Sequence, residues 1–236
     1  MTVAWFGASR HKAALRDADR ASPGSVPAAT PAVSRTLMHP PAGTHDPNLD
    51  DGRPAALVRE LYFDDVAGLH CAQGHLQILA APDGLPSLCD AAATQLMRVR
   101  AFPVPEPRQS PAMCTYLVAY EGTADDLDAW VTHYTTHHTA RMAHFPRIRE
   151  IEVGTQLDWR HALSWAHVNR MLRNKVVFDD PSGLRAALNS PVRHDMRAND
   201  ATCRKFTGPA THYPMHAAVV GRSHLAGGVA ACQRRG

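Results

Sequence analysis

Residues 123–146 read TADDLDAWVTHYTTHHTARMAHFP, and the interpretation of the whole chain starts from this stretch. Thr123 is a suitable N-cap, the aspartates after it place negative charge where the helix dipole favours it, and Pro146 ends the segment. The stretch therefore predicts one amphipathic helix. Its inward face is predicted from residues that recur at intervals of three and four, namely Leu127, Trp130, Val131, Tyr134, His138, Arg141, Met142 and Phe145.

Two histidines of this helix are candidates for catalysis. His138 falls on the apolar face beside Trp130 and Tyr134, and His137 precedes it. A histidine in this position is either a proton-transfer group in a pocket or a core histidine with one hydrogen-bond partner, and residue chemistry alone favours the second interpretation. His133 and His137 have H-x-x-x-H spacing, but no third ligand stands near them, so we expect no metal site.

Short strands and helices with proline-rich connections make up the rest of the chain. Alternating or β-branched runs predict strands at residues 1–8, 56–63, 113–120, 147–153, 167–178 and 211–217. Helices are predicted at 11–21, from 66 to about 79, at 88–98, and from Asp180–Pro181 through Asn199 with a break at Pro191. Prolines predict a loop at 22–54 and a linker at 102–109.

The predicted elements form an internal repeat. Residues 113–217 follow the order of a ferredoxin-like βαββαβ unit. Phe63-Asp64-Asp65-x-x-Gly68-Leu69-x-x-Ala72 matches Phe178-Asp179-Asp180-x-x-Gly183-Leu184-x-x-Ala187, and the same shift places Pro31 on Pro146. A repeat of this length indicates duplication.

We therefore predict an α+β fold in which two ferredoxin-like βαββαβ repeats form an intra-chain dimeric α/β barrel. The domains are 1–108, a divergent first repeat with the Pro-rich loop 22–54, then 109–217, the second repeat, and 218–236, a flexible tail. Each sheet leaves one face open, and packing the two faces together buries both. The residues expected between the sheets are Val118, Ile151, Val176, Phe178, Leu61 and Phe63.

The second half resembles the EthD-like branch of the dimeric α+β barrel superfamily. The resemblance covers residues 112–217 well and 1–105 only through the repeat, and it is carried by Trp130-x-x-x-Tyr134-x-x-x-His138, Phe145-Pro146-x-Ile148, Val177-Phe178-Asp179, Ser190-Pro191-x-Arg193 and His212-Tyr213-Pro214-Met215. It implies a protein of aromatic or polyketide-like metabolism, with relatives that are cyclases, isomerases, lactone-processing enzymes and oxygenases. The family's helix histidine corresponds to His138. The resemblance indicates a fold more strongly than a reaction.

The site expected from these residues has His138 and His137 as acid/base groups. A histidine can remove a proton from a phenol or from a carbon next to a carbonyl. The residues expected to bind the substrate are Trp130, Tyr134, Tyr116, Arg173, Asn174, His212 and Tyr213, and Arg160 is a further candidate for the developing oxyanion. The alternative interpretation is that Trp130 and Tyr134 are ordinary core residues and that Arg173 is a solvated surface group. The hypothesis is cofactor-independent proton chemistry; the alternative is a non-catalytic ligand-binding or accessory protein.

Composition and motifs exclude several other classes. The chain has 236 residues and a formal charge of +3 without a basic run, so no nucleic-acid partner is expected. No run approaches the roughly 18 apolar residues of a membrane span, and no signal peptide is recognised. Five scattered cysteines indicate reduced thiols in the cytoplasm. There is no G-x-G-x-x-G, P-loop or G-x-S-x-G, so we expect no cofactor. We expect a monomeric pseudo-dimer or a homodimer.

The repeat shift also predicts an asymmetric molecule. It sets Leu15 against Trp130, Asp19 against Tyr134, Ser22 against His137 and Pro23 against His138. The first copy lacks both histidines and both aromatics, and its proline ends the helix early. We expect one functional pocket per chain.

Overall fold

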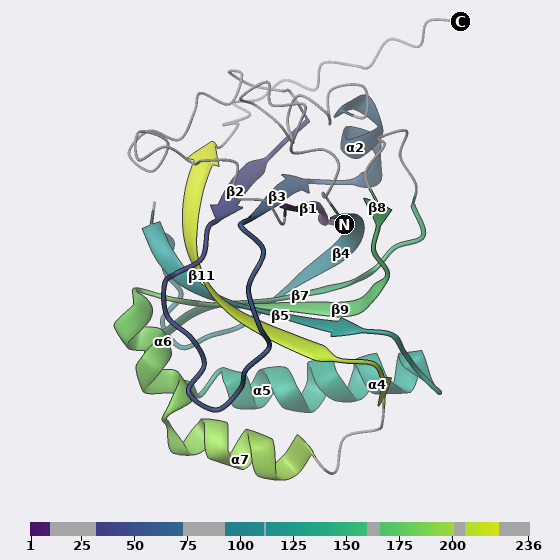
Figure 1. Ribbon diagram of the computed structural model, residues 1–236. Helices are drawn as coiled ribbons and strands as arrows, with labels where there is room; N and C mark the ends of the chain where they lie inside the picture. Colours follow the sequence, from purple (N-terminus) through teal and green to yellow (C-terminus); the bar gives the residue numbers. More distant parts are fainter. Residues whose placement is uncertain (10–31, 73–92, 111, 160–165, 201–205, 222–236) are drawn as a thin grey trace, which may run out of the picture.

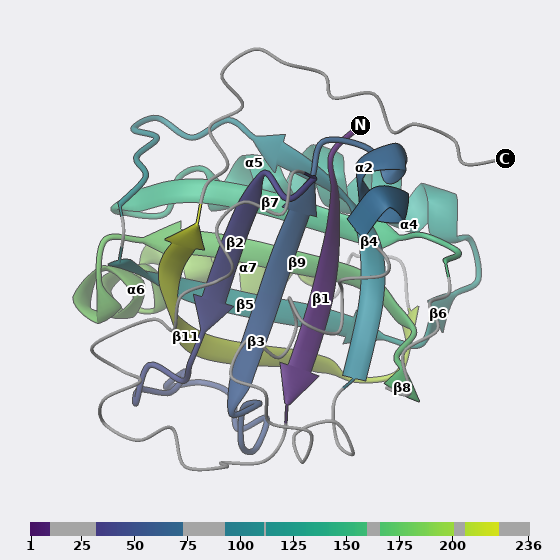
Figure 2. The same ribbon diagram turned by 90° about the horizontal axis from the view of Figure 1, so that it is seen from above.

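Eight strands close into an antiparallel barrel in the computed structural model, which describes residues 1–9, 32–72, 93–110, 112–159, 166–200 and 206–221. The strands are β1 (Val3–Ser9), β2 (Arg35–His39), β3 (Leu57–Phe63), β4 (Ala93–Phe102), β5 (Ala112–Glu121), β7 (Ile148–Gln156), β9 (Arg170–Phe178) and β11 (Ala210–Gly221). Their order is β1-β3-β2-β11-β5-β9-β7-β4, and β4 pairs back with β1. Figure 2 shows β2, β3 and β1 crossing over β5, β7 and β9. The predicted α+β class is confirmed.

The helices lie on the outside of the barrel. In Figure 1, α4 (Leu127–His133) and α5 (Thr139–Met142) run beneath β5 and β9, with α6 (Pro181–Leu188) and α7 (Pro191–Asp200) beside them. On the other half of the barrel, α2 (Val66–Ala72) packs against β3. Two short pairings remain: β6 (Thr123–Ala124) with β10 (Phe206–Thr207), and β8 (Ala166–His167) with β4.

Several local predictions are wrong. The helix predicted at 88–98 is replaced by β4, and the proline-rich loop contains β2. Both strands complete the barrel by pairing with segments far away in sequence, and such partners outweigh local propensity. The supposed flexible tail begins with strand, because β11 runs to Gly221. The helix predicted at 11–21 lies outside the described residues.

The side chains expected between the two sheets are buried, but under the helices instead. Ile151, Val176 and Phe178 pack with Trp130 and the other apolar residues of the outer helices. Val118 belongs to this same core, whereas Leu61 and Phe63 pack with Leu69 and Ala72 of α2. Inside the barrel, Ala4, Phe6, Leu37, Tyr62 and Met97 form a separate small apolar cluster.

Charged side chains fill much of the remaining interior. The Lys175 Nζ lies 2.6 Å from Glu152 Oε2 and 2.9 Å from Glu150 Oε1. Glu60 Oε2 lies 3.5 Å from the same nitrogen, and the Tyr62 hydroxyl is 2.6 Å from it. Since buried charges are stable only when paired, this network joins β3 of the first half to β7 and β9 of the second.

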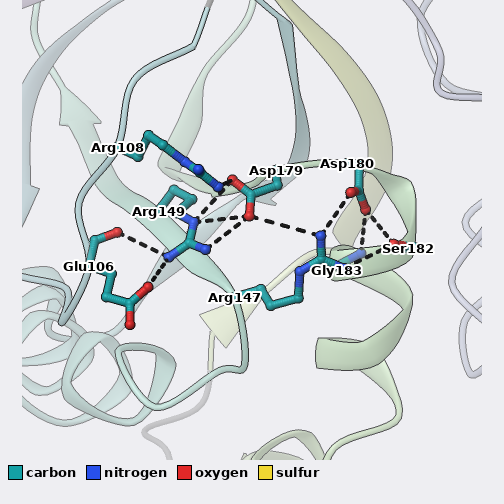
Figure 3. Close-up of polar contacts among 8 residues, drawn as sticks. All are labelled: Glu106, Arg108, Arg147, Arg149, Asp179, Asp180, Ser182 and Gly183. Atoms are coloured by element: carbon teal, nitrogen blue, oxygen red, sulfur yellow. Dashed lines mark hydrogen bonds and ion pairs between the residues drawn. The ribbon is translucent and has the colours of Figure 1, made fainter.

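The linker at residues 102–109 forms ion pairs with the second half of the chain, and arginines supply the positive charges (Figure 3). Arg149 forms ion pairs with Glu106 at 2.8 Å and with Asp179 at 2.9 Å, and Arg108 pairs with the same Asp179. The predicted start of α6 is confirmed, since the Asp180 carboxylate accepts a hydrogen bond from the Gly183 N–H at 2.8 Å. The hydrogen bond from the Ser182 hydroxyl, this capping by Gly183 and the Arg147 guanidinium lower the pKa of Asp180 to about 2.

Candidate functional site

The histidine helix begins later than predicted and contains a wide turn. Its N-cap is Asp126, whose carboxylate accepts from the Ala129 N–H at 2.9 Å, while Thr123 lies in β6. Residues Tyr134–His138 form a π-helical turn, η3. Such turns insert an extra residue and shift the faces of a helix. Arg141, which follows this turn, is exposed, and so is Leu127 at the start of α4, contrary to the predicted inward face.

A cavity of about 240 Å³ separates these helices from the barrel wall. Its walls are mainly apolar and aromatic, and the side chains of Tyr116, His138, Asn174, Arg193, Arg197 and His212 supply polar groups. Mostly apolar walls with a few convergent polar groups are typical of small-molecule sites.

His138 lies at the helix side of the cavity. Its ring stacks on Tyr134 with centroids 4.4 Å apart at 26°. Burial, followed by the positive charges of Arg193 and Arg141, lowers the pKa of His138 to about 4. The imidazole is therefore neutral at pH 7 and able to accept a proton.

Tyr116 and Arg193 are held from the opposite side by Asp46. The Tyr116 hydroxyl donates to the Asp46 carboxylate, and Arg193 Nη2 lies 3.6 Å from that carboxylate. Burial and the aspartate raise the pKa of Tyr116 well above its usual range, so the phenol stays protonated. The Arg193 Nε is buried without a hydrogen-bond partner among the described residues, and it remains available to a ligand oxygen.

His212 is oriented by a second aspartate of the same loop. Its Nδ1 and its backbone N–H each lie 2.8 Å from Asp51 Oδ2. Because a carboxylate can only accept, Nδ1 carries the proton, and the neutral ring presents Nε2 as an acceptor. Burial outweighs the aspartate and lowers the pKa of His212.

The connection between β2 and β3 brings both aspartates to the site. It runs along β11 toward α5 and α7 (Figure 1), and the His216 N–H donates to the Pro40 carbonyl at 2.8 Å. Sequence reasoning missed Asp46 and Asp51, because they stand in the segment predicted as a proline-rich loop of the other half. Their only signal was a cluster of aspartates between prolines.

The structure brings together five of the expected site residues, which line the cavity: His138, Tyr134, Tyr116, Asn174 and His212. Arg173 and Tyr213 lie elsewhere, on the inner side of the barrel wall, because alternate residues of a strand point to opposite faces.

Trp130 and His137 also lie outside the cavity lining. Trp130 is core, stacked on Tyr134 at 5.3 Å behind the cavity. His137 is exposed beside His133, with ring centroids 4.7 Å apart. Arg160 lies outside the described residues.

Two general findings concern the part of the chain that the structure describes. No group of three or more His, Cys, Asp or Glu side chains there is placed to hold a metal ion. None of its helices is long and apolar enough to cross a membrane.

The closed barrel with its outer helices is similar to dimeric α+β barrel folds. An anthrone oxidase-like protein of solved structure superimposes with a TM-score of 0.60 at 11% identity, covering 96% of each chain. A candidate monooxygenase from Fusobacterium nucleatum subsp. nucleatum gives 0.56 at 9% identity, covering 93% of this chain and 92% of the other. One from Lactobacillus acidophilus gives 0.52 at 13% identity, covering 94% and 97%. No protein-family model and no curated protein matches the sequence. At these identities the similarity shows the fold alone.

Proposed function

We propose that the chain is a small-molecule enzyme that binds an aromatic or polyketide-like compound between helix and barrel wall and performs cofactor-independent proton chemistry with His138. The observation that carries the proposal is the neutral His138 imidazole in a cavity of about 240 Å³ with aromatic walls. The five cysteines are odd in number and scattered, which suits a reducing compartment, so we place the protein in the cytoplasm.

The reaction step follows from the polar groups around the cavity. The His138 imidazole takes a proton from a phenol or from a carbon next to a carbonyl, and the electron pair of that bond moves to the substrate oxygen. The Arg193 guanidinium, whose Nε has no hydrogen-bond partner among the described residues, stabilises this oxyanion. Returning the proton to another atom of the substrate completes an isomerisation or a cyclisation without a net change of electrons.

The lowered pKa of His138 restricts the substrates that suit this step. An isolated imidazolium is disfavoured in the cavity, because burial disfavours the charged form. An imidazolium beside a newly formed enolate is an ion pair, and the low dielectric strengthens it. The substrate must therefore become anionic in the same step. Anthrones, after which one similar structure is named, are aromatic ketones with such an acidic C–H bond.

The second candidate is a non-catalytic ligand-binding protein. The observation in its favour is the same pKa of about 4, since so weak a base is a poor proton acceptor for a substrate that stays neutral.

A binding screen followed by turnover measurements decides between the two. Phenols, anthrones and polyketide-like ketones that occupy the cavity raise the unfolding midpoint in a concentration-dependent way. For any binder that is turned over, His138→Gln should lower kcat by about 10²–10⁴-fold and leave affinity within a few fold. His137→Gln is the matched control on the exposed face and should change neither. Binding without turnover of any candidate would establish the accessory function.

We also propose the tandem repeat, with units 1–108 and 109–217. A shift of 115 residues, that from Phe63 to Phe178, places α2 on α6, puts β2 and β3 within β7 and β9, and makes β4 overlap most of its length with β11. The strand orders β2-β3-β1-β4 and β11-β5-β9-β7 are the same when one of them is read in reverse. Residues 109–221 expressed alone should then associate into dimers in analytical ultracentrifugation, and a well-folded monomer would contradict this.

A further inference from the structure

A second cavity lies inside the barrel, on the opposite face of the sheet from His138. Its volume is about 70 Å³. Apolar side chains form most of the wall, among them Phe6, Val58, Leu117 and Met215. Charged side chains also line the cavity. The function proposed above does not use this space.

Most of the charged groups around the inner cavity are already paired. The carboxylates of Glu60 and Glu152 face Lys175 at 3.5 and 2.6 Å. Arg170 Nε lies 3.2 Å from Glu121 Oε1. These groups therefore leave little charge for a ligand.

Arg173 is different. Its guanidinium lies over the Phe6 ring, 4.6 Å from the centroid. Within the described ranges it forms no ion pair, and its Nε is buried without a hydrogen-bond partner. Burial and then the charge of Arg170 lower the pKa of Arg173 to about 9, so the side chain is still a cation at pH 7. The side chain as a whole is partly buried. A partly desolvated cation without an ion pair is less stable than a paired one, and an anion beside it would supply the missing partner.

The neighbouring cations of the interior already have carboxylates beside them. Arg35 lies 3.4 Å from Glu150, and Lys175 lies 2.9 Å from the same residue. No such carboxylate pairs with Arg173 among the described residues.

We propose that this inner cavity binds a short-chain monocarboxylate, with the carboxylate on Arg173 and the alkyl end against Val58 and Leu117. A water-sized group needs about 12 Å³ of such volume, so the cavity has room for about five non-hydrogen atoms. Propionate has that number. The planar guanidinium fork can donate two parallel hydrogen bonds to a carboxylate.

Titration of the full chain with propionate tests the site. Propionate should raise the unfolding midpoint in a dose-dependent way, and its neutral isostere propionamide should not. Arg173→Met should weaken binding by about ten- to a hundredfold, the usual loss for charge-assisted hydrogen bonds. Arg185→Met removes an exposed arginine of α6 and should leave binding unchanged.

Two further measurements keep the test decisive if Arg173→Met fails to fold. Ala119→Leu, beside Arg173 in the β5–β9 register, should fill the cavity and block propionate. An intermolecular nuclear Overhauser effect should join the propionate CH₂ to the Met215 methyl group. Equal stabilisation by propionamide or by nitrate, or unaltered binding in either cavity variant, would overturn the proposal.

Discussion

Replacing Lys175 by methionine should be one of the most destabilising single changes in the barrel. The side chain is 5% exposed and its Nζ lies within 3.5 Å of carboxylate oxygens from Glu60, Glu150 and Glu152. Methionine keeps the volume and removes the charge, which leaves these carboxylates close together without their cation. Breaking a buried ion pair in this way costs about 3–5 kcal/mol, and the unfolding midpoint should fall by roughly 10 °C.

Urea denaturation at several pH values is the assay. Lys175 lowers the pKa of Glu60 and Glu150, so the stabilisation is present above their unfolded pKa of 4.5 and is lost as the pH falls below it. The difference between wild type and Lys175→Met should therefore shrink as the pH falls below about 4.5. Glu152→Gln is the control and should cost much less, because the pKa of Glu152 is already raised. A loss below about 1 kcal/mol for Lys175→Met, or a difference independent of pH, would refute the reasoning.

Four further outcomes are expected. Because His138 must be neutral to accept a proton and its pKa is about 4, the acidic limb of kcat/KM should lie near pH 4 instead of 6.5. Asp46→Asn should weaken ligand affinity about tenfold and lower the pKa of Tyr116, visible in an ultraviolet titration, because the carboxylate that raises it is gone. In urea denaturation, Gly122→Ala should lower the free energy of unfolding by well over the about 1–2 kcal/mol expected for Gly43→Ala. Both glycines have positive φ, but of the two only a Cβ at 122 would meet another atom, at 1.7 Å. Calorimetry with any aromatic ligand should give one site per chain, and two would reject the predicted asymmetry.

Local sequence patterns predicted the elements whose signals are local. The strand at 56–63 agrees with β3, and the Asp180–Pro181 start of α6 is confirmed with its capping hydrogen bond. Capping and alternation act over a few residues, so they can be read from the sequence. The segment at 88–98 failed because β4 is held by β1 and β7, whose residues are far away along the chain.

For the candidate site, the sequence supplied five of the lining residues from the helix, the strands and the family resemblance, namely His138, Tyr134, Tyr116, Asn174 and His212. Asp46 and Asp51 could not be found in this way, because a loop from the other half carries them across β11.

The order of elements in residues 113–217 and the histidine helix were determined by the sequence itself. Which sheet face is exposed was decided only by the tertiary structure. The alternation of Glu150, Glu152, Arg173 and Lys175 along their strands predicts a solvated face, and the same pattern is stable inside the barrel because closure places most of these charges opposite partners. A strand fixes which residues share a face, but only the element packed against that face determines whether it meets water.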